Sequence, residues 1–164
     1  MFFERDVVER IVEAMPTPYD LLTLLLGTLG LRWGEAVALR GRHADLLRKR
    51  LRIEVSLAEI SGRLVFGTPK SHAARSVPLT PRLATALGAH LETVGADELV
   101  FTSPQGEPLR HRNFDSRQWR PTLKRLGLPS VGLHVLRHSA AARLINAGAS
   151  PKAVQSILGH RSAP

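Results

Sequence analysis

The spacing of hydrophobic residues changes along this chain, and the change restricts the folds that it can adopt. Over residues 4–15, apolar side chains recur at three- and four-residue steps, and residues 19–29 are rich enough in leucine for a buried helix. Residues 51–57 instead alternate apolar and polar side chains, from Leu51 to Leu57, as a half-buried strand does. Helical patterns return in the second half. The sequence therefore predicts an α+β fold that is mostly α-helical.

Turn and capping residues suggest the other elements. A threonine or serine followed by proline, which favours a helix start, occurs at Thr80-Pro81 and at Ser150-Pro151. Further helices are expected at 33–40, 81–94, 110–126, 134–147 and 151–158. Strands are expected at 51–57, 63–67 and 75–79, joined in a small three-stranded antiparallel sheet. The sequence has no internal repeat or low-complexity linker, so we expect a single domain over residues 1–164.

Composition narrows the kind of protein. The sequence has no cysteine, which excludes a disulfide framework and a thiolate zinc site. Its first residues do not follow a signal-peptide pattern, and its longest apolar run is too short to span a bilayer, so a soluble, intracellular protein is expected. The formal net charge is +9, and 19 of the 23 basic residues are arginine. This balance suits a polyanion such as nucleic acid, although solvated basic faces would give the same composition.

Two segments in the first half carry candidate chemistry. Arg32 and Glu35 lie one helical turn apart and can pair, and Lys70 falls in a predicted turn beside Ser71 and His72. Each has an ordinary reading as well, namely a surface ion pair and a solvated turn.

The C-terminal half carries two more candidates. His134 and Arg137 lie one turn apart near a predicted helix start, where an anion is favoured, and His160 follows the helix-ending Gly159. Two arginines, a lysine and two histidines converging on one point would suit a phosphodiester. We expect no metal and no cofactor, because the sequence lacks a third metal ligand near His134, paired carboxylates for a two-metal site and a glycine-rich phosphate loop.

Three stretches resemble the tyrosine recombinase (phage integrase) catalytic domain. They are TLGLRWGEAVAL, GTPKSHAARSVPL and LHVLRHSAAARLINAGASPKAVQSILGH, in the same helix–sheet–helix order. The resemblance implies that Arg32 and Arg137 hold the scissile phosphate and that Lys70 protonates the departing 5′ oxygen. It also implies that His134 serves in proton transfer with the nucleophile. His160 would hydrogen-bond the phosphate, and Glu35 would support the site.

The resemblance also implies a nucleophile that the chain does not contain. In the family, a tyrosine within about a dozen residues after the Gly-His pair attacks the phosphate, giving a 3′-phosphotyrosyl intermediate. Here four residues follow His160, and the sole tyrosine, Tyr19, does not match that position. We therefore expect a catalytic domain truncated before its nucleophile, without the family's N-terminal core-binding domain, and inactive in DNA cleavage by itself.

The expected partners are double-stranded DNA and other recombinase protomers, as a tetramer in the full-length protein, with no membrane. The expected location is the cytoplasm, at the nucleoid. Two alternatives remain open: a non-catalytic DNA-binding remnant of an integrase, and a structural or partner-binding helical domain. The arginines of the predicted basic helix are candidate DNA contacts, chiefly to phosphate. They are Arg110, Arg112, Arg117 and Arg120.

Overall fold

A buried helix lies at the centre of the helical part of the molecule. The computed structural model describes residues 1–70 and 73–160. Helix α2 (Tyr19–Leu29) packs against α1 (Arg5–Ala14) and α7 (Val135–Asn146), and it also contacts α4 (Pro81–Leu91). Nine of the eleven residues of α2 are buried, which explains its nearly continuous leucine sequence. The helix ends at Gly30, whose φ of 66° is the left-handed conformation that glycine adopts without strain.

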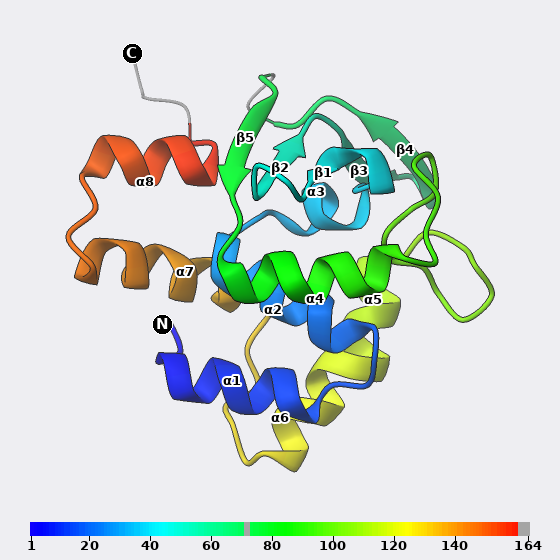
Figure 1. Cartoon of the computed structure of the whole chain (residues 1–164). Coiled ribbons are helices and arrows are strands. Elements are labelled where there is room, and N and C mark those ends of the chain that lie inside the picture. Colours follow the sequence, from blue (N-terminus) through cyan, green and yellow to red (C-terminus); the bar gives the residue numbers. More distant parts are fainter. Residues whose placement is uncertain (71–72, 161–164) are drawn as a thin grey trace.

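The strands form two small antiparallel sheets (Figure 1). Strands β1 (Ala44–Asp45), β2 (Arg50–Ile53) and β5 (Arg75–Pro78) form a three-stranded sheet in the order β1-β2-β5. Strands β3 (Ser56–Ile60) and β4 (Arg63–Gly67) form a separate hairpin. The three-stranded antiparallel sheet is confirmed, but its strands differ from those expected.

The predicted strand at 51–57 is divided between the two sheets. Strand β2 ends at Ile53, and β3 begins at Ser56 and packs against α3 (Trp33–Val37). The two backbones approach so closely that a Cβ atom on Gly34 would lie 2.5 Å from the Leu57 carbonyl oxygen. The alternating pattern does not reveal this bend, because Leu57 is buried in the observed hairpin and would also be buried in one continuous strand.

Two of the predicted helices are shorter than expected, and two others match their expected bounds. Helix α3 ends at Val37, after which the 3₁₀ turn η1 (Gly41–His43) leads into the first sheet, and α4 ends at Leu91. Helices α7 and α8 (Pro151–Leu158) match the expected 134–147 and 151–158 to within a residue.

The predicted helix at 110–126 is interrupted by a π-helical turn. It consists of α5 (His111–Phe114), the π turn η2 (Asp115–Trp119) and α6 (Arg120–Arg125). The Arg120 amide donates to the carbonyl of Asp115, five residues earlier. Pro121 explains the interruption, because it has no N–H to donate and its ring clashes with the carbonyl four residues before it.

One hydrophobic core connects the helices and the sheets. Its largest fully buried side chain, Trp119, donates from Nε1 to the carbonyl of Val131 at 2.8 Å. Buried leucines from α2, α4 and α6 and residues of β2 and β5 belong to the same cluster. Within residues 1–70 and 73–160, no helix is both long enough and apolar enough to cross a membrane.

Candidate active site

The first part of the site is built at the start of α3. Arg32 is the N-cap residue, and its backbone amide donates to Glu35 Oε2 at 3.0 Å. The Arg32 guanidinium also contacts Glu35 Oε1, at 3.3 Å. The Glu35 side chain is fully buried, whereas that of Arg32 is 26% exposed. The pair that the i, i+3 spacing predicted is therefore present, and the cation keeps access to a ligand.

A third residue, Arg75 on β5, completes this ion pair and was not anticipated from the sequence. Its Nη1 and Nη2 atoms donate to the two carboxylate oxygens of Glu35, each at 2.9 Å. Burial by itself would raise the pKa of Glu35, but the hydrogen bonds and charge of Arg75, followed by those of Arg32, lower it below its usual value. The sequence did contain a signal, because Arg75 lies two residues before buried Val77 and therefore on the same, inner face of β5.

The second arginine of the predicted site, Arg137, lies buried on α7. Its guanidinium donates from Nη1 to the carbonyl of Gly30 and from Nη2 to that of Leu158, the latter at 2.8 Å. Burial, followed by the positive charge of Arg32, lowers the pKa of Arg137 to about 10. Arg137 and Arg32 face the adjacent carbonyls of Leu158 and Gly159, so an anion that contacted both arginines would offset their mutual repulsion.

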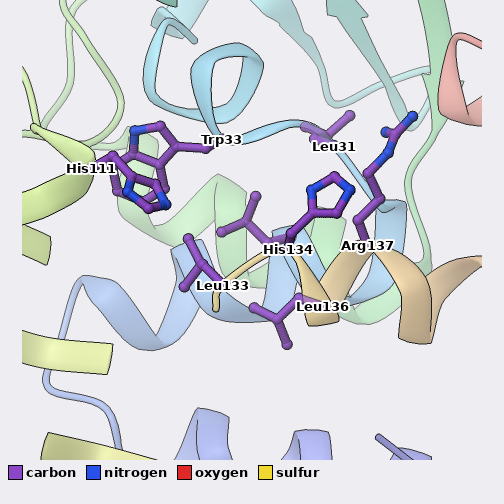
Figure 2. Close-up of a pocket in the computed structure, with 8 residues that line it drawn as sticks. Leu31, Trp33, His111, Leu133, His134, Leu136 and Arg137 are labelled. Atoms are coloured by element: carbon purple, nitrogen blue, oxygen red, sulfur yellow. The ribbon is translucent and has the colours of Figure 1, made fainter. Parts of the chain in front are cut away.

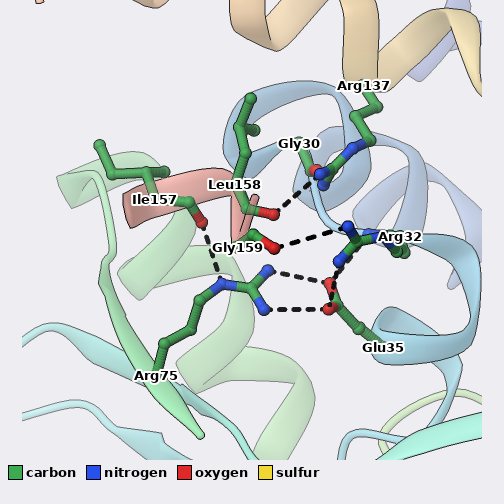
Figure 3. Close-up of polar contacts among 8 residues, drawn as sticks. All are labelled: Gly30, Arg32, Glu35, Arg75, Arg137, Ile157, Leu158 and Gly159. Carbon is green, nitrogen blue, oxygen red and sulfur yellow. Dashed lines mark hydrogen bonds and ion pairs between the residues drawn. The ribbon is translucent and has the colours of Figure 1, made fainter. Parts of the chain in front are cut away.

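The C-terminal end of α8 joins these arginines. Three consecutive carbonyls of its last turn each face a different guanidinium (Figure 3). Arg75 Nε donates to the carbonyl of Ile157 at 3.1 Å, and Arg137 donates to that of Leu158. Arg32 Nη2 approaches the carbonyl of Gly159 at 3.5 Å. These are carbonyls that a helix leaves without partners at its negative end, where cations are favoured.

The two predicted histidines lie beside the arginines. His134 immediately precedes α7. Its pKa is lowered below the usual value, mainly by loss of hydration and to a smaller extent by the positive charges of His138, Arg137, Arg32 and His160. Loss of hydration also lowers the pKa of His160, with further effects of Arg137, Arg32 and Arg75. His134 also lines the same cavity as Arg137, and His160 directly follows Gly159, whose carbonyl Arg32 approaches.

A cavity of about 60 Å³ adjoins His134 and Arg137 (Figure 2). Trp33 and His111 line it from the other side, with their rings 5.4 Å apart in an edge-on contact. The remaining lining residues are leucines of α2, α7 and the segments before α3 and α7. The site therefore has an apolar wall next to its cations.

Lys70 stands apart from this cluster in the observed contacts. It is exposed in the turn after β4, and within the described residues no hydrogen bond or ion pair links it to the arginines. Its neighbours Ser71 and His72, which the sequence placed in the same turn, lie outside the described residues.

The predicted DNA-contacting arginines have two different environments. Arg110 donates to Glu59 at 2.8 Å and to the Gly62 carbonyl, and Arg120 pairs with Asp115 at 2.6 Å. The other two, Arg112 and Arg117, are exposed.

The only tyrosine in the sequence is hydrogen-bonded to a backbone carbonyl and packed against a phenylalanine. Tyr19 is buried, and its hydroxyl donates to the carbonyl of Thr102 at 3.1 Å. Its ring contacts Phe114 edge-on, with centroids 5.4 Å apart, and burial raises its pKa. Within residues 1–70 and 73–160, no three histidine or acidic side chains gather as metal ligands would.

This chain belongs to the phage integrase family, whose pattern matches residues 1–163. It is similar to the putative prophage phiRv2 integrase of Mycobacterium tuberculosis, with 32% identity over 96% of this chain and 44% of that protein. It is also similar to the tyrosine recombinase XerC of Brucella melitensis, with 33% identity over 87% of this chain and 42% of that protein. The chain thus spans less than half the length of these relatives.

Solved structures give the same fold. The Tn1549 transposon integrase in complex with a circular intermediate DNA has a TM-score of 0.84 at 22% identity, covering 99% of this chain and 58% of that one. XerA recombinase has a TM-score of 0.81 at 23% identity, covering 99% and 55%. The catalytic domain of bacteriophage HP1 integrase has a TM-score of 0.67 at 18% identity, covering 98% and 81%. The predicted tyrosine-recombinase catalytic fold is confirmed.

Proposed function

We propose that this chain is the phosphate-activating part of a site-specific DNA recombinase. The observation that carries the proposal is that Arg32 and Arg137 both face the last turn of α8, next to His160, while His134 lines one cavity with Arg137. Two arginines with two histidines beside them suit a phosphodiester, whose transition state gains negative charge on its non-bridging oxygens. Membership of the phage integrase family supports recombination as the reaction.

The proposed chemistry needs neither a metal nor a nucleotide cofactor. Arg32 and Arg137 bind the non-bridging oxygens, and His160 donates a hydrogen bond to one of them. A tyrosine oxygen attacks phosphorus while His134 accepts the phenolic proton. The bond from phosphorus to the 5′ oxygen breaks, and Lys70 gives its proton to that oxygen. A DNA 5′-hydroxyl then attacks the phosphotyrosyl link and reverses the step, so the bond energy is conserved.

The attacking tyrosine in this proposal comes from outside residues 1–164. The buried hydroxyl of Tyr19 is already committed to the Thr102 carbonyl, and its pKa is raised, which makes it a poor nucleophile. Residues 1–164 would then bind and polarise the phosphate without cleaving DNA by themselves.

The proposed partners are duplex DNA and further protomers of the recombinase on the same DNA, with four in the whole assembly, in the bacterial cytoplasm at the nucleoid. Two observations support DNA as a partner. The net charge is +9, and the similar Tn1549 integrase was solved with DNA. Arg112 and Arg117 are exposed and available for phosphate contacts outside the catalytic cluster, whereas Arg110 and Arg120 would have to exchange their present partners.

A salt titration tests the binding part of this proposal. Affinity for a duplex oligonucleotide is measured by fluorescence anisotropy at several salt concentrations for the wild type, Arg32→Ala and Arg82→Ala. Arg82 pairs with Glu9 outside the cluster and serves as the matched control. Loss of a phosphate contact at Arg32 should reduce the slope of log affinity against log salt by about 1. Equal slopes for the two variants would contradict a phosphate site at Arg32.

A covalent-adduct assay tests the catalytic part. The gene is read past the codon for Pro164, and the chain extended to include the next tyrosine is incubated with nicked duplex DNA. We expect a protein–DNA adduct that is lost in Arg137→Lys. DNA binding without any adduct would favour the non-catalytic DNA-binding alternative, and no retention of DNA at low salt would favour the partner-binding alternative.

A further inference from the structure

Arg75 connects two parts of the site but has no place in the chemistry above. Its side chain is 11% exposed. The planar guanidinium donates three hydrogen bonds. Two go to the oxygens of Glu35, each at 2.9 Å, and the third goes to the Ile157 carbonyl at 3.1 Å. It therefore joins the start of α3 to the last turn of α8 (Figure 3).

The Arg75 guanidinium also packs directly against the turn that carries His160. A Cβ atom on Gly159 would lie 2.7 Å from Arg75 Nη1 and 2.8 Å from its central carbon. Gly159 has a φ of +69°, so both its backbone conformation and its lack of a side chain are needed here. The shape of this turn is thus matched to a guanidinium at this position.

We propose that Arg75 is a positioning residue, which fixes the Glu35 carboxylate and the Gly159-His160 turn relative to each other so that Arg32 and His160 reach the same phosphate. Arg75 acts on Arg32 through Glu35, which contacts both arginines, and on His160 through the turn. This inference rests on the proposed function, because it takes phosphate as the ligand of Arg32 and His160.

The geometry distinguishes Arg75 from an ordinary ion pair. The Arg82–Glu9 pair joins an exposed arginine to a half-buried glutamate and uses a single guanidinium nitrogen for both of its close contacts. Arg75 uses all three of its nitrogens as donors within a buried network. Lysine would keep the charge but could not reproduce the planar fork. The substitution Arg75→Lys therefore separates position from charge.

The experiment titrates inorganic phosphate into three forms of this chain: the wild type, Arg75→Lys and the control Arg82→Lys. NMR signals of the Arg32 and Arg137 Nε–H groups and of the His160 ring report contact with the anion, and the Gly159 amide reports the turn. We expect all three side chains to respond in the wild type and in Arg82→Lys. In Arg75→Lys, phosphate should bind roughly tenfold more weakly. The Arg32 and His160 responses should shrink most, because Arg137 keeps its contact with the Gly30 carbonyl.

The outcomes separate this inference from the proposed function. A wild type that binds phosphate at these residues, with an equal affinity and equal responses in Arg75→Lys, overturns the positioning role and leaves the proposed function intact. A wild type in which none of the three side chains responds overturns the proposed function. In that case the spectra without phosphate still test whether Arg75 fixes the Gly159-His160 turn. A Gly159 amide signal that is the same in the wild type and in Arg75→Lys would refute that role.

A second variant applies if Arg75→Lys does not fold. Gly159→Ala displaces the guanidinium without changing any charge, whereas Gly148→Ala places the same strain at a left-handed glycine with open space around it. Weaker phosphate binding in Gly159→Ala than in Gly148→Ala supports the inference, and equal binding in the two variants overturns it.

Discussion

Replacing Glu35 by glutamine should destabilise the protein strongly, because it removes the only carboxylate that contacts Arg32 and Arg75 among the described residues. Removing one partner of a buried ion pair costs about 3–5 kcal/mol, since the remaining charge loses its compensation. Arg75 and Arg32 are 11% and 26% exposed, so water reaches part of each cation. We therefore expect a loss of about 3–4 kcal/mol in the free energy of unfolding. For a chain of this size, that corresponds to a fall in Tm of about 6–16 °C.

Urea unfolding measures this loss through tryptophan fluorescence, to which fully buried Trp119 and half-buried Trp33 both contribute. The matched control is Glu9→Gln, which breaks the exposed pair with Arg82 and should cost at most about 1 kcal/mol. A Glu35→Gln variant within 1 kcal/mol of that control would refute the reasoning, because it would mean that Arg75 is well solvated without its carboxylate.

Three further outcomes are expected. Gly159→Ala should lower the free energy of unfolding by at least about 1 kcal/mol more than Gly148→Ala does in thermal melts, because only the former meets Arg75. The pKa values of His134 and His160 are lowered in the folded state, so the unfolded chain binds protons first as the pH falls through 6.5. The free energy of unfolding should therefore decrease below that pH. The decrease should be smaller when both histidines are replaced by glutamine. An unchanged decrease would contradict the lowered pKa values of the two histidines. Trp119→Ala should cost about 3–5 kcal/mol in urea unfolding, since it opens a cavity and leaves the Val131 carbonyl without its donor, and a smaller cost would show that the core relaxes around it.

The sequence predicted helices well where a buried stripe and a capping residue agreed. Helix α8 begins after Ser150, whose side chain accepts from the Ala153 amide, and ends at left-handed Gly159, as expected. Helix α2 has the bounds that its leucines and Gly30 indicated. The strands were harder, because Leu51, Ile53 and Leu57 are buried on both sides of the bend between β2 and β3, and the sequence does not show that Val55 is only half-buried.

The candidate site was predictable in its motif residues but incomplete in its connections. Arg32 and Glu35 pair as their spacing indicated, and Arg32 and Arg137 both face the last turn of α8, while the roles of these residues and of the two histidines stay predictions. Arg75 was missed because its partners, Glu35 and the Ile157 carbonyl, are 40 and 82 positions away in the sequence. Local spacing cannot indicate a contact between residues so far apart in the sequence. An arginine on the inner face of a strand does, however, imply that an acceptor is buried near it.

The last turn of α8 is held through its backbone carbonyl oxygens, and this restricts changes in the length of the helix. Exchanging Ile157 or Leu158 for another residue leaves the carbonyls that meet Arg75 and Arg137 chemically unchanged. Inserting or deleting one residue within α8 would instead rotate the oxygens beyond that point by about 100°, away from their donors. The exposed side chains of α8 are therefore less constrained than its length, which is tied to the arginines, whereas Val154 and Leu158 are also constrained by their burial in the core.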